Sequence, residues 1–129
     1  MVILSIPALG LFTIAENGNR QEVIDRPNRA ALWTWGKLTV IADHNYQGFY
    51  KINRAVVGRT RAYLGLRGYI CDVSEIGYIL TTDEGNRLFR ADGRPVNKAW
   101  ADGLCLYTCI TKTAPDTTRV RLTHWREIT

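Results

Sequence analysis

Short apolar runs, separated by glycine, proline and polar turn residues, fill most of this chain. Runs typical of strands include Val2–Ile6, Leu11–Ile14, Lys37–Ala42, Leu104–Ile110 and Arg119–Trp125. Further strand candidates are Arg20–Ile24 after the Asn17-Gly18-Asn19 turn, Thr60–Leu66, Tyr69–Val73 and Gly77–Thr81. From these candidates we expect about seven or eight short strands and little helix. The pattern therefore predicts an all-β protein, either a barrel or a sandwich.

Three segments do not fit a simple strand pattern. Ala30–Trp35 is predicted to form a short helical turn or the lip of a groove, with both tryptophans covering the edge of the core. Asp83–Gly103 is the longest polar stretch, and we expect a short hairpin or helix that lies over the sheet. A short inward-packing helix is indicated by rough helical spacing of the apolar residues Phe49, Ile52, Val56 and Val57.

The apolar N-terminus is interpreted as a strand and a turn rather than a signal peptide. It has no basic residues, and Pro7 and Gly10 interrupt the apolar run early. No apolar stretch reaches the roughly 18 residues that a membrane-spanning helix needs. We expect residues 1–129 to form a single domain, and any membrane anchor of the native protein to be absent from this chain.

The chain carries a net charge of +5, which suits an anionic partner such as nucleic acid, a membrane or a cell-wall polymer without choosing among them. The segment from Lys51 to Arg67 holds five basic residues and no acid, with Tyr50 and Tyr63 nearby. Interleaved cations and aromatic rings are typical of nucleic-acid binding. A solvated surface of strands and turns explains the same pattern, and we prefer that interpretation.

Three cysteines cannot all pair with one another, so at least one thiol is free. The spacing of Cys71, Cys105 and Cys109 lacks the paired cysteines of a structural zinc site, and the sequence indicates no metal site. Nothing in it resembles a nucleotide-binding glycine loop or a serine-centred triad, and we expect no cofactor. Cys105 is expected to be a small buried apolar residue.

Cys109, Arg119 and His44 each stand at the end of a predicted strand. If Leu104–Ile110 and Arg119–Trp125 are antiparallel neighbours, Cys109 and Arg119 lie at one end of the sheet. A guanidinium beside a thiol favours the thiolate by lowering its pKa. His44 follows the strand Lys37–Ala42, at a position suited to facing a cleft, although from position alone we prefer a capping or solvent-facing imidazole.

The sequences around these residues resemble the sortase family. Leu106-Tyr107-Thr108-Cys109 is similar to the cysteine motif of sortases, Thr-Leu-x-Thr-Cys, with an arginine heading the next strand at Arg119. Ile41-Ala42-Asp43-His44-Asn45 looks like the segment that carries the sortase histidine, and Leu4–Pro7 with Leu9-Gly10 looks like the opening strand. The resemblance covers nearly the whole chain, from Leu4 to about Trp125.

The resemblance implies a cysteine transpeptidase on a closed eight-stranded β-barrel. Such an enzyme cleaves a sorting signal of the Leu-Pro-x-Thr-Gly kind, holds the acyl part as a thioester and passes it to an amine of the cell wall or of a pilin. By position, Cys109 is then the nucleophile, His44 the proton donor and acceptor, and Arg119 the group that holds the substrate and stabilises the oxyanion, with Arg121 as the alternative arginine. Asn45, Leu106 and Thr108 are expected to flank the site and contact the substrate.

The resemblance also implies a monomer at the extracellular face of a bacterial membrane, with no nucleic-acid partner and with the membrane contacted only through the absent anchor. Two departures stand out: Cys105 replaces the first threonine of the motif, and Asp43 stands where glycine often precedes the histidine. The charge of Asp43 is expected to raise the pKa of His44.

Two other functions remain open. A non-catalytic basic β-barrel could bind nucleic acid or a cell-wall glycan, in which case Cys109 would be inert and binding would weaken steeply with salt. A cysteine hydrolase could use the same thioester chemistry with water as the acceptor. The sequence does not separate transfer from hydrolysis, because access of the acceptor depends on the shape of the loops.

Overall fold

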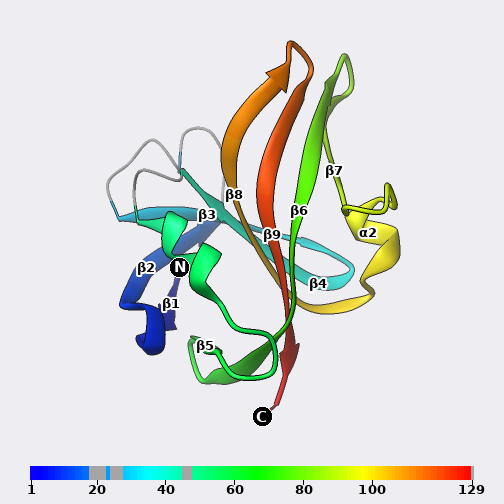
Figure 1. Ribbon diagram of the computed structural model, residues 1–129. Helices are drawn as coiled ribbons and strands as arrows, with labels where there is room; N and C mark the ends of the chain where they lie inside the picture. The colour runs from blue at the N-terminus through cyan, green and yellow to red at the C-terminus, as the bar shows by residue number, and fades with distance from the viewer. Residues whose placement is uncertain (18–22, 24–27, 45–47, 129) are drawn as a thin grey trace.

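The computed structural model describes residues 1–17, 23, 28–44 and 48–128 (Figure 1). The strands are β1 (Val2–Ile6), β2 (Leu11–Asn17), β3 (Arg29–Trp35), β4 (Lys37–Asp43), β5 (Arg61–Leu64), β6 (Arg67–Thr82), β7 (Gly85–Phe89), β8 (Asp102–Ala114) and β9 (Thr117–Glu127). Two 3-10 helices, η1 (Pro7–Leu9) and η3 (Phe49–Arg54), and one short α-helix, α2 (Val96–Ala99), connect them.

Eight of the strands close into a barrel. Their order is β5-β1-β2-β3-β4-β8-β9-β6, and β6 pairs with β5 to complete the ring, while β7 extends β6 outside it. Two neighbouring pairs, β2–β3 and β4–β8, are parallel, and the other pairs are antiparallel. The all-β class and the closed eight-stranded barrel expected from the sequence are both confirmed.

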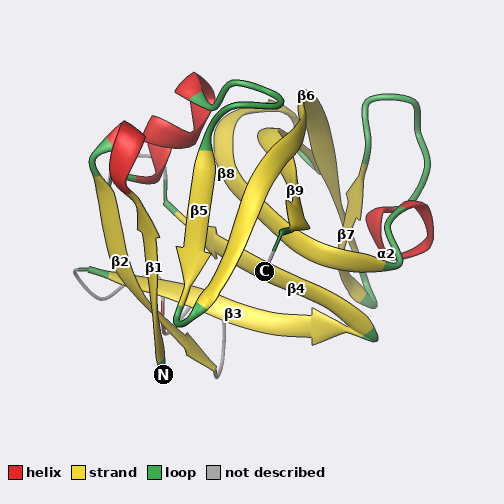
Figure 2. Ribbon diagram, turned by 90° about the horizontal axis from the view of Figure 1, so that it is seen from below, coloured by secondary structure: helices red, strands yellow, loops and turns green. Residues whose placement is uncertain are grey.

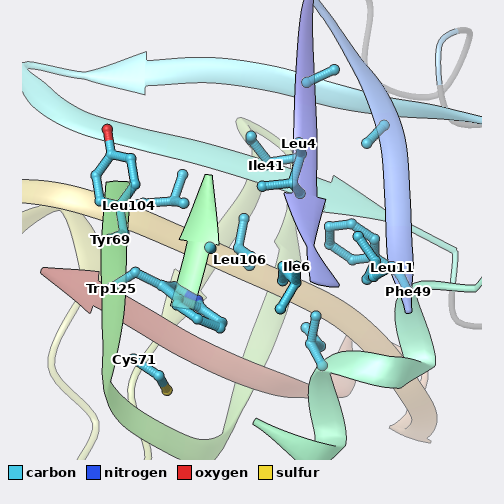
Figure 3. Close-up of a cluster of buried hydrophobic side chains, with 14 residues drawn as sticks. Leu4, Ile6, Leu11, Ile41, Phe49, Tyr69, Cys71, Leu104, Leu106 and Trp125 are labelled. Atoms are coloured by element: carbon cyan, nitrogen blue, oxygen red, sulfur yellow. The ribbon is translucent and has the colours of Figure 1, made fainter. Parts of the chain in front are cut away.

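An apolar core fills the inside of the barrel (Figure 3). Trp125, Tyr69 and Phe49 are its largest fully buried side chains. Around them pack aliphatic residues of the strands and of η3, which are Leu4, Ile6, Leu11, Ile41, Ile52, Leu104 and Leu106. Because side chains of a strand point alternately to its two faces, only every second residue of β1, β4 and β8 enters this core. The other residues of β4 and β8 form a second cluster on the outside.

The second cluster lies on the outer surface of β4, β8, β9 and β6. Its buried members are Leu38, Val40, Ala42, Ile79, Leu88, Val96, Trp100, Cys105, Tyr107, Val120 and Leu122. This cluster is covered by the segment Asp83–Gly103, as expected. The covering side chains are Leu88 of β7, Val96 of α2 and Trp100, which follows α2. Trp33 and Trp35 pack against its edge, which confirms their expected position. This part of the sheet is therefore buried on both faces.

Several sequence expectations need correction. Ala30–Trp35 belongs to a regular strand, β3, in which Trp33 pairs with Val40 of β4. The segments Tyr69–Val73 and Gly77–Thr81 join into the single long strand β6. A side chain at Gly77 would collide with the carbonyl oxygen of Phe89, so this glycine lets β7 approach rather than ending the strand. The expected strand Arg20–Ile24 falls largely outside the described residues.

The predicted helix after β4 is present, but it is shorter than the apolar spacing indicated. It comprises η3, whose Phe49 and Ile52 are buried in the core. Val56 and Val57 follow in a loop and are exposed, so the expectation that they pack inward is wrong. Among the described residues, the helices are all too short or too polar to cross a membrane.

Candidate functional site

The parallel pairing of β4 and β8 brings His44 next to Cys109. Ala42 pairs with Tyr107, and Asp43 pairs with Thr108. The next position along both chains is His44 and Cys109. Since neighbouring strands lie about 4.8 Å apart, two residues 65 positions apart in the sequence become lateral neighbours, His44 directly after the end of β4 and Cys109 within the longer strand β8.

The register also indicates which way the two side chains point. Ala42 and Tyr107, two residues before His44 and Cys109, both belong to the outer cluster. Side chains two residues apart on a strand share a face, so the imidazole and the thiol continue along the outer surface of the sheet. His44 is half-buried, and Cys109 is exposed. A nucleophile and a proton carrier are thus gathered on one accessible surface.

Asp43 lies on the inner side of the same strand end. It is only 4% exposed, and burial raises the pKa of its carboxyl to about 7. Its Oδ1 accepts a hydrogen bond from the backbone N–H of His44 at 2.7 Å. The carboxyl group therefore holds the backbone that carries the histidine. At a pKa of about 7, the Asp43 carboxyl is ionised only in part at neutral pH.

A second contact joins the two strands at this level. The hydroxyl of Thr108 is fully buried and donates a hydrogen bond of 2.9 Å to the carbonyl oxygen of Asp43. A pocket of about 160 Å³, lined by Asp43, Thr13, Phe49 and Lys51 among others, opens on the inner side. Asp43 and Thr108 thus form a buried support directly behind the residues that carry the imidazole and the thiol.

The environment of Cys109 differs from the sequence expectation. Val120, not an arginine, stands directly opposite Cys109 on β9. Although the residue is exposed, burial by its surroundings raises the pKa of the thiol. The expected lowering of this pKa by a neighbouring guanidinium is therefore wrong. The thiol is the neutral form at physiological pH.

The two arginines of β9 leave the strand on the face opposite to Val120. Arg121 pairs with Thr108, and its guanidinium donates hydrogen bonds to Asn53 Oδ1 at 2.9 Å and to Ser74 Oγ at 3.4 Å. It therefore ties β9 to η3 and β6. Arg119 pairs with Thr111, beyond a β-bulge at Ile110, and is exposed. Of the two arginines that the sequence left open, Arg119 is the more accessible to a ligand.

Two of the three residues expected to contact substrate, Leu106 and Thr108, are buried inside the barrel. Leu106 is fully buried in the inner core, and Thr108 is fully buried against Asp43, so neither lines an open surface. This corrects their assignment as substrate contacts: both precede Cys109 by odd numbers of residues and face inward. Asn45 lies outside the described residues.

Sequence reasoning placed Trp33 and Trp35 at the edge of the core but missed their association with Tyr107, two residues before Cys109. Tyr107 contacts Trp33 edge-to-face with ring centroids 6.0 Å apart, and Trp33 contacts Trp35 in the same way at 6.0 Å. The alternation of Trp33 and Trp35 around Thr34 was a strand signal that could have placed both rings on one face. These rings line the same face of the sheet that carries the imidazole and thiol.

A second histidine lies in a separate buried network. His124 Nδ1 is 2.7 Å from Asp72 Oδ1, its Nε2 is 2.8 Å from the carbonyl oxygen of Asp102, and its ring packs on Trp100. Both ring nitrogens are thus used for structure. Cys71 and Cys105 are buried, and burial raises the pKa of Cys71 to about 11. Within the described part of the chain no cluster of side chains is suited to hold a metal.

Comparison with known proteins identifies the architecture. No protein-family model matches this chain, and no curated protein sequence matches it. Solved structures do match. Streptococcus agalactiae sortase C1 is 16% identical over 99% of this chain and 66% of its own, with a TM-score of 0.65. Listeria monocytogenes sortase A is also 16% identical, over 99% and 90%, with a TM-score of 0.58.

A third similar structure is sortase C from Clostridium perfringens, 14% identical over 100% of this chain and 71% of its own, with a TM-score of 0.62. The chain thus spans about two thirds of the sortase C structures and most of sortase A. Identities this low carry information about architecture alone. Together with the closed barrel and its strand order, they establish that this chain has the sortase fold.

Proposed function

We propose that residues 1–129 form a sortase-like catalytic domain, a cysteine transpeptidase that acts on a sorting signal of the Leu-Pro-x-Thr-Gly kind. The observation that carries this proposal is the parallel register of β4 and β8, which makes His44 the lateral neighbour of Cys109 on one accessible face. The sortase fold supports the same assignment. Cys109 is the nucleophile, and His44 moves protons.

Because the Cys109 thiol is neutral, the first step must remove its proton. His44 accepts the proton of Cys109 as the sulfur attacks the carbonyl carbon of the scissile peptide bond. The resulting oxyanion is stabilised by a positive group, which we assign to Arg119 because it is exposed whereas Arg121 is bound to Asn53 and Ser74. Arg119 leaves β9 on the face opposite to Cys109, so this role requires its side chain to move around the sheet beyond the bulge at Ile110 when substrate binds. The imidazolium then donates its proton to the departing amine, and the acyl group remains as a thioester.

The second step regenerates the enzyme. An amine of the cell wall or of a pilin attacks the thioester, and His44 accepts the proton that this amine loses. The thiolate leaves and takes the proton back from His44. The bulge at Ile110 turns the strand just after the nucleophile, where bulges commonly re-aim side chains. The domain is then active at the extracellular face of a bacterial membrane, where its protein substrates and amine acceptors are exposed.

The aromatic surface beside Cys109 fits an extended peptide. Tyr107, Trp33 and Trp35 lie on the outer face of the sheet, where the two tryptophans are partly exposed and Tyr107 is buried beneath them. Proline and leucine side chains gain from contact with such rings, since both are apolar. Asp43 and Thr108 act through position, because they hold the backbones of His44 and Cys109 from behind.

The test is a library of fluorogenic peptides of the Leu-Pro-x-Thr-Gly kind, incubated with the protein and with small primary amines, with products identified by mass spectrometry. We expect the acyl fragment to appear joined to the amine, and a thioester on Cys109 to be trapped with poor acceptors. Cys109→Ala and His44→Ala remove both products.

Other results have distinct meanings. Cleavage that depends on Cys109 but always ends in the free acid identifies a hydrolase with the same site. No thioester and no cleavage across the library, from a protein shown to be folded, refutes the catalytic assignment. Tight binding of nucleic acid or glycan that weakens with salt then supports the basic binding module.

A further inference from the structure

One outer surface of the barrel combines exposed arginines with exposed apolar side chains. We name it the β5 face and define it by the outward residues of β5 and its neighbouring strands, together with the two adjoining loops. Its members are Ile3, Phe12, Val56, Val57, Arg59, Arg61, Tyr63, Leu66, Ile70 and Arg126. Figure 2 shows β5 lying between β1 and β6 on the side turned toward the viewer.

The strand registers place these residues on one surface. Tyr63 pairs with Ser5 of β1, and Ser5 pairs with Phe12 of β2. Arg61 pairs with Ile70 of β6, and Ile70 pairs with Arg126 of β9. Paired residues point to the same side of a sheet, and Ala62, between Arg61 and Tyr63, is fully buried inside. The β5 face therefore runs across five neighbouring strands.

The apolar side chains on this face are unusually open to solvent. Leu66, at the turn between β5 and β6, is completely exposed, and Phe12 is 61% exposed. Val56 and Val57 project from the loop before β5, and each is at least half exposed. Single exposed apolar residues are ordinary, but several on one surface mark a place of contact.

The charges on this face have one predominant sign. Its charged members are all arginines, and the segment between His44 and Cys71, which supplies Arg59 and Arg61, contains no acid. Arg59, Arg61 and Arg126 are exposed here. A second copy of the chain would meet this surface with the same positive charge, so self-association through it is disfavoured.

We propose that the β5 face docks the protein onto the surface of an anionic lipid bilayer. Arginines bind the negative headgroups, while Leu66, Phe12 and the valines enter the boundary between headgroups and acyl chains. A nucleic acid or an anionic glycan would satisfy the arginines but leave these aliphatic side chains in water. The combination of charge and exposed aliphatic groups therefore fits a bilayer better than a polyanion.

The position of this face agrees with such a role and does not depend on the proposed activity. In the ring of eight strands, β4 stands four places from β5 in either direction. His44 and Cys109 thus lie on the wall opposite the β5 face, and a protein bound to a membrane through β5 keeps that wall turned toward the solvent. Docking would limit the diffusion of the domain to the membrane surface.

The test is cosedimentation with vesicles of phosphatidylcholine alone or with about 30% phosphatidylglycerol. We expect binding to the anionic vesicles, weakened by salt. The double variant Arg61→Gln/Arg126→Gln should lose roughly 30-fold in affinity, since each basic residue near an anionic membrane contributes about fivefold. Leu66→Ser/Phe12→Ser should also weaken binding, although it keeps every charge.

The matched control is Arg87→Gln/Lys98→Gln, which removes the same charge from exposed positions on β7 and α2. It should bind the anionic vesicles within about twofold of the wild type. Circular dichroism establishes that each variant is folded. Equal losses in the control and the β5-face variant would overturn the proposal, because charge alone would then explain binding. Binding to single-stranded DNA in preference to vesicles, unaffected by Leu66→Ser/Phe12→Ser, would overturn it as well.

Discussion

The hydroxyl of Thr108 donates a hydrogen bond to the carbonyl oxygen of Asp43, across 65 positions of sequence and over 2.9 Å. This contact joins the residue before Cys109 to the residue before His44. The Thr108 side chain is fully buried, and this hydrogen bond lies on the inner side of the sheet, behind His44 and Cys109. The relative placement of thiol and imidazole therefore depends on the interior of the barrel as well as on the exposed surface.

We expect Thr108→Val to loosen this placement. Valine preserves the shape of threonine but cannot donate a hydrogen bond, so the loss should cost about 1 to 3 kcal/mol of stability. Urea unfolding measures that cost, and the turnover of a cleaved peptide measures the effect on the site. Turnover should fall in the variant even under conditions where it is fully folded.

The control is Thr123→Val, which removes another fully buried threonine hydroxyl, one that donates to the carbonyl oxygen of Leu106 and accepts from Nε1 of Trp125. It should cost at least as much stability as Thr108→Val and leave turnover near the wild-type value. If both variants lose turnover in proportion to their loss of stability, the bond from Thr108 to Asp43 has no special role in positioning the site.

Asp43 should make stability depend on pH. Its pKa is raised from 3.8 to about 7 in the folded protein, so the native state holds a proton that the unfolded state releases earlier. Stability due to this group is therefore greatest at low pH and falls as the pH rises from about 4 to about 7. The total change is at most about 4 kcal/mol.

Asp43→Asn removes this titration while keeping an oxygen that can accept the N–H of His44. We expect the free energy of unfolding of the variant to exceed that of the wild type above neutral pH, and the difference between the two to shrink toward acid. Urea titrations from about pH 4 to about pH 9 measure it. If the free energies of unfolding of the two proteins depend on pH in the same way, the carboxyl of Asp43 has an ordinary pKa in the folded protein.

Alkylation by iodoacetamide should distinguish the three thiols. Cys109 is exposed, whereas Cys71 and Cys105 are buried, so Cys109 should react first and the other two only on unfolding. Because the pKa of Cys109 is raised, its rate should increase about tenfold per pH unit between about pH 7 and pH 9. A plateau at neutral pH would mean that a nearby cation stabilises the thiolate after all.

Gly103 should be intolerant of any side chain. Its φ is +90°, and a Cβ there would lie 2.6 Å from the carbonyl oxygen of Trp125 and 2.8 Å from Nε2 of His124. Gly103→Ala should cost roughly 2 to 5 kcal/mol, from backbone strain together with the clash. Gly36→Ala, at a φ of +62° with nothing nearby, should show the strain alone. If thermal unfolding shows the same loss of stability for Gly103→Ala and Gly36→Ala, the clash at Gly103 contributes nothing.

The sequence was informative where the pattern is local and failed where it depends on register. The strands holding His44 and Cys109 could be predicted, because each is a short apolar run that ends in polar residues. Their parallel pairing joins segments far apart in the chain, which no local pattern encodes. Ala30–Trp35 was misread because both faces of β3 are largely apolar, so its alternation is weak.

The side chains around the Cys109 thiol also depend on strand register, which the sequence pattern does not give. The expected contact between Cys109 and an arginine required a register of β8 and β9 in which an arginine stands opposite the cysteine. The structure has a bulge at Ile110, and Val120 stands opposite Cys109. A shift of one residue sends a side chain to the other face of a sheet, so the charge beside a thiol cannot be read from spacing alone.

The two arginines of β9 should separate stability from activity. Arg121 is half-buried and bound to Asn53 and Ser74, so Arg121→Ala should lower stability by about 1 to 3 kcal/mol. Arg119 is exposed, and Arg119→Ala should change stability by no more than about 0.5 kcal/mol. If Arg119 stabilises the oxyanion, its removal should reduce kcat by about 100-fold or more while Arg121→Ala retains most of it. The reverse pattern, with activity lost only in a stably folded Arg121→Ala, would move the role to Arg121 and require its guanidinium to leave Asn53 when substrate binds.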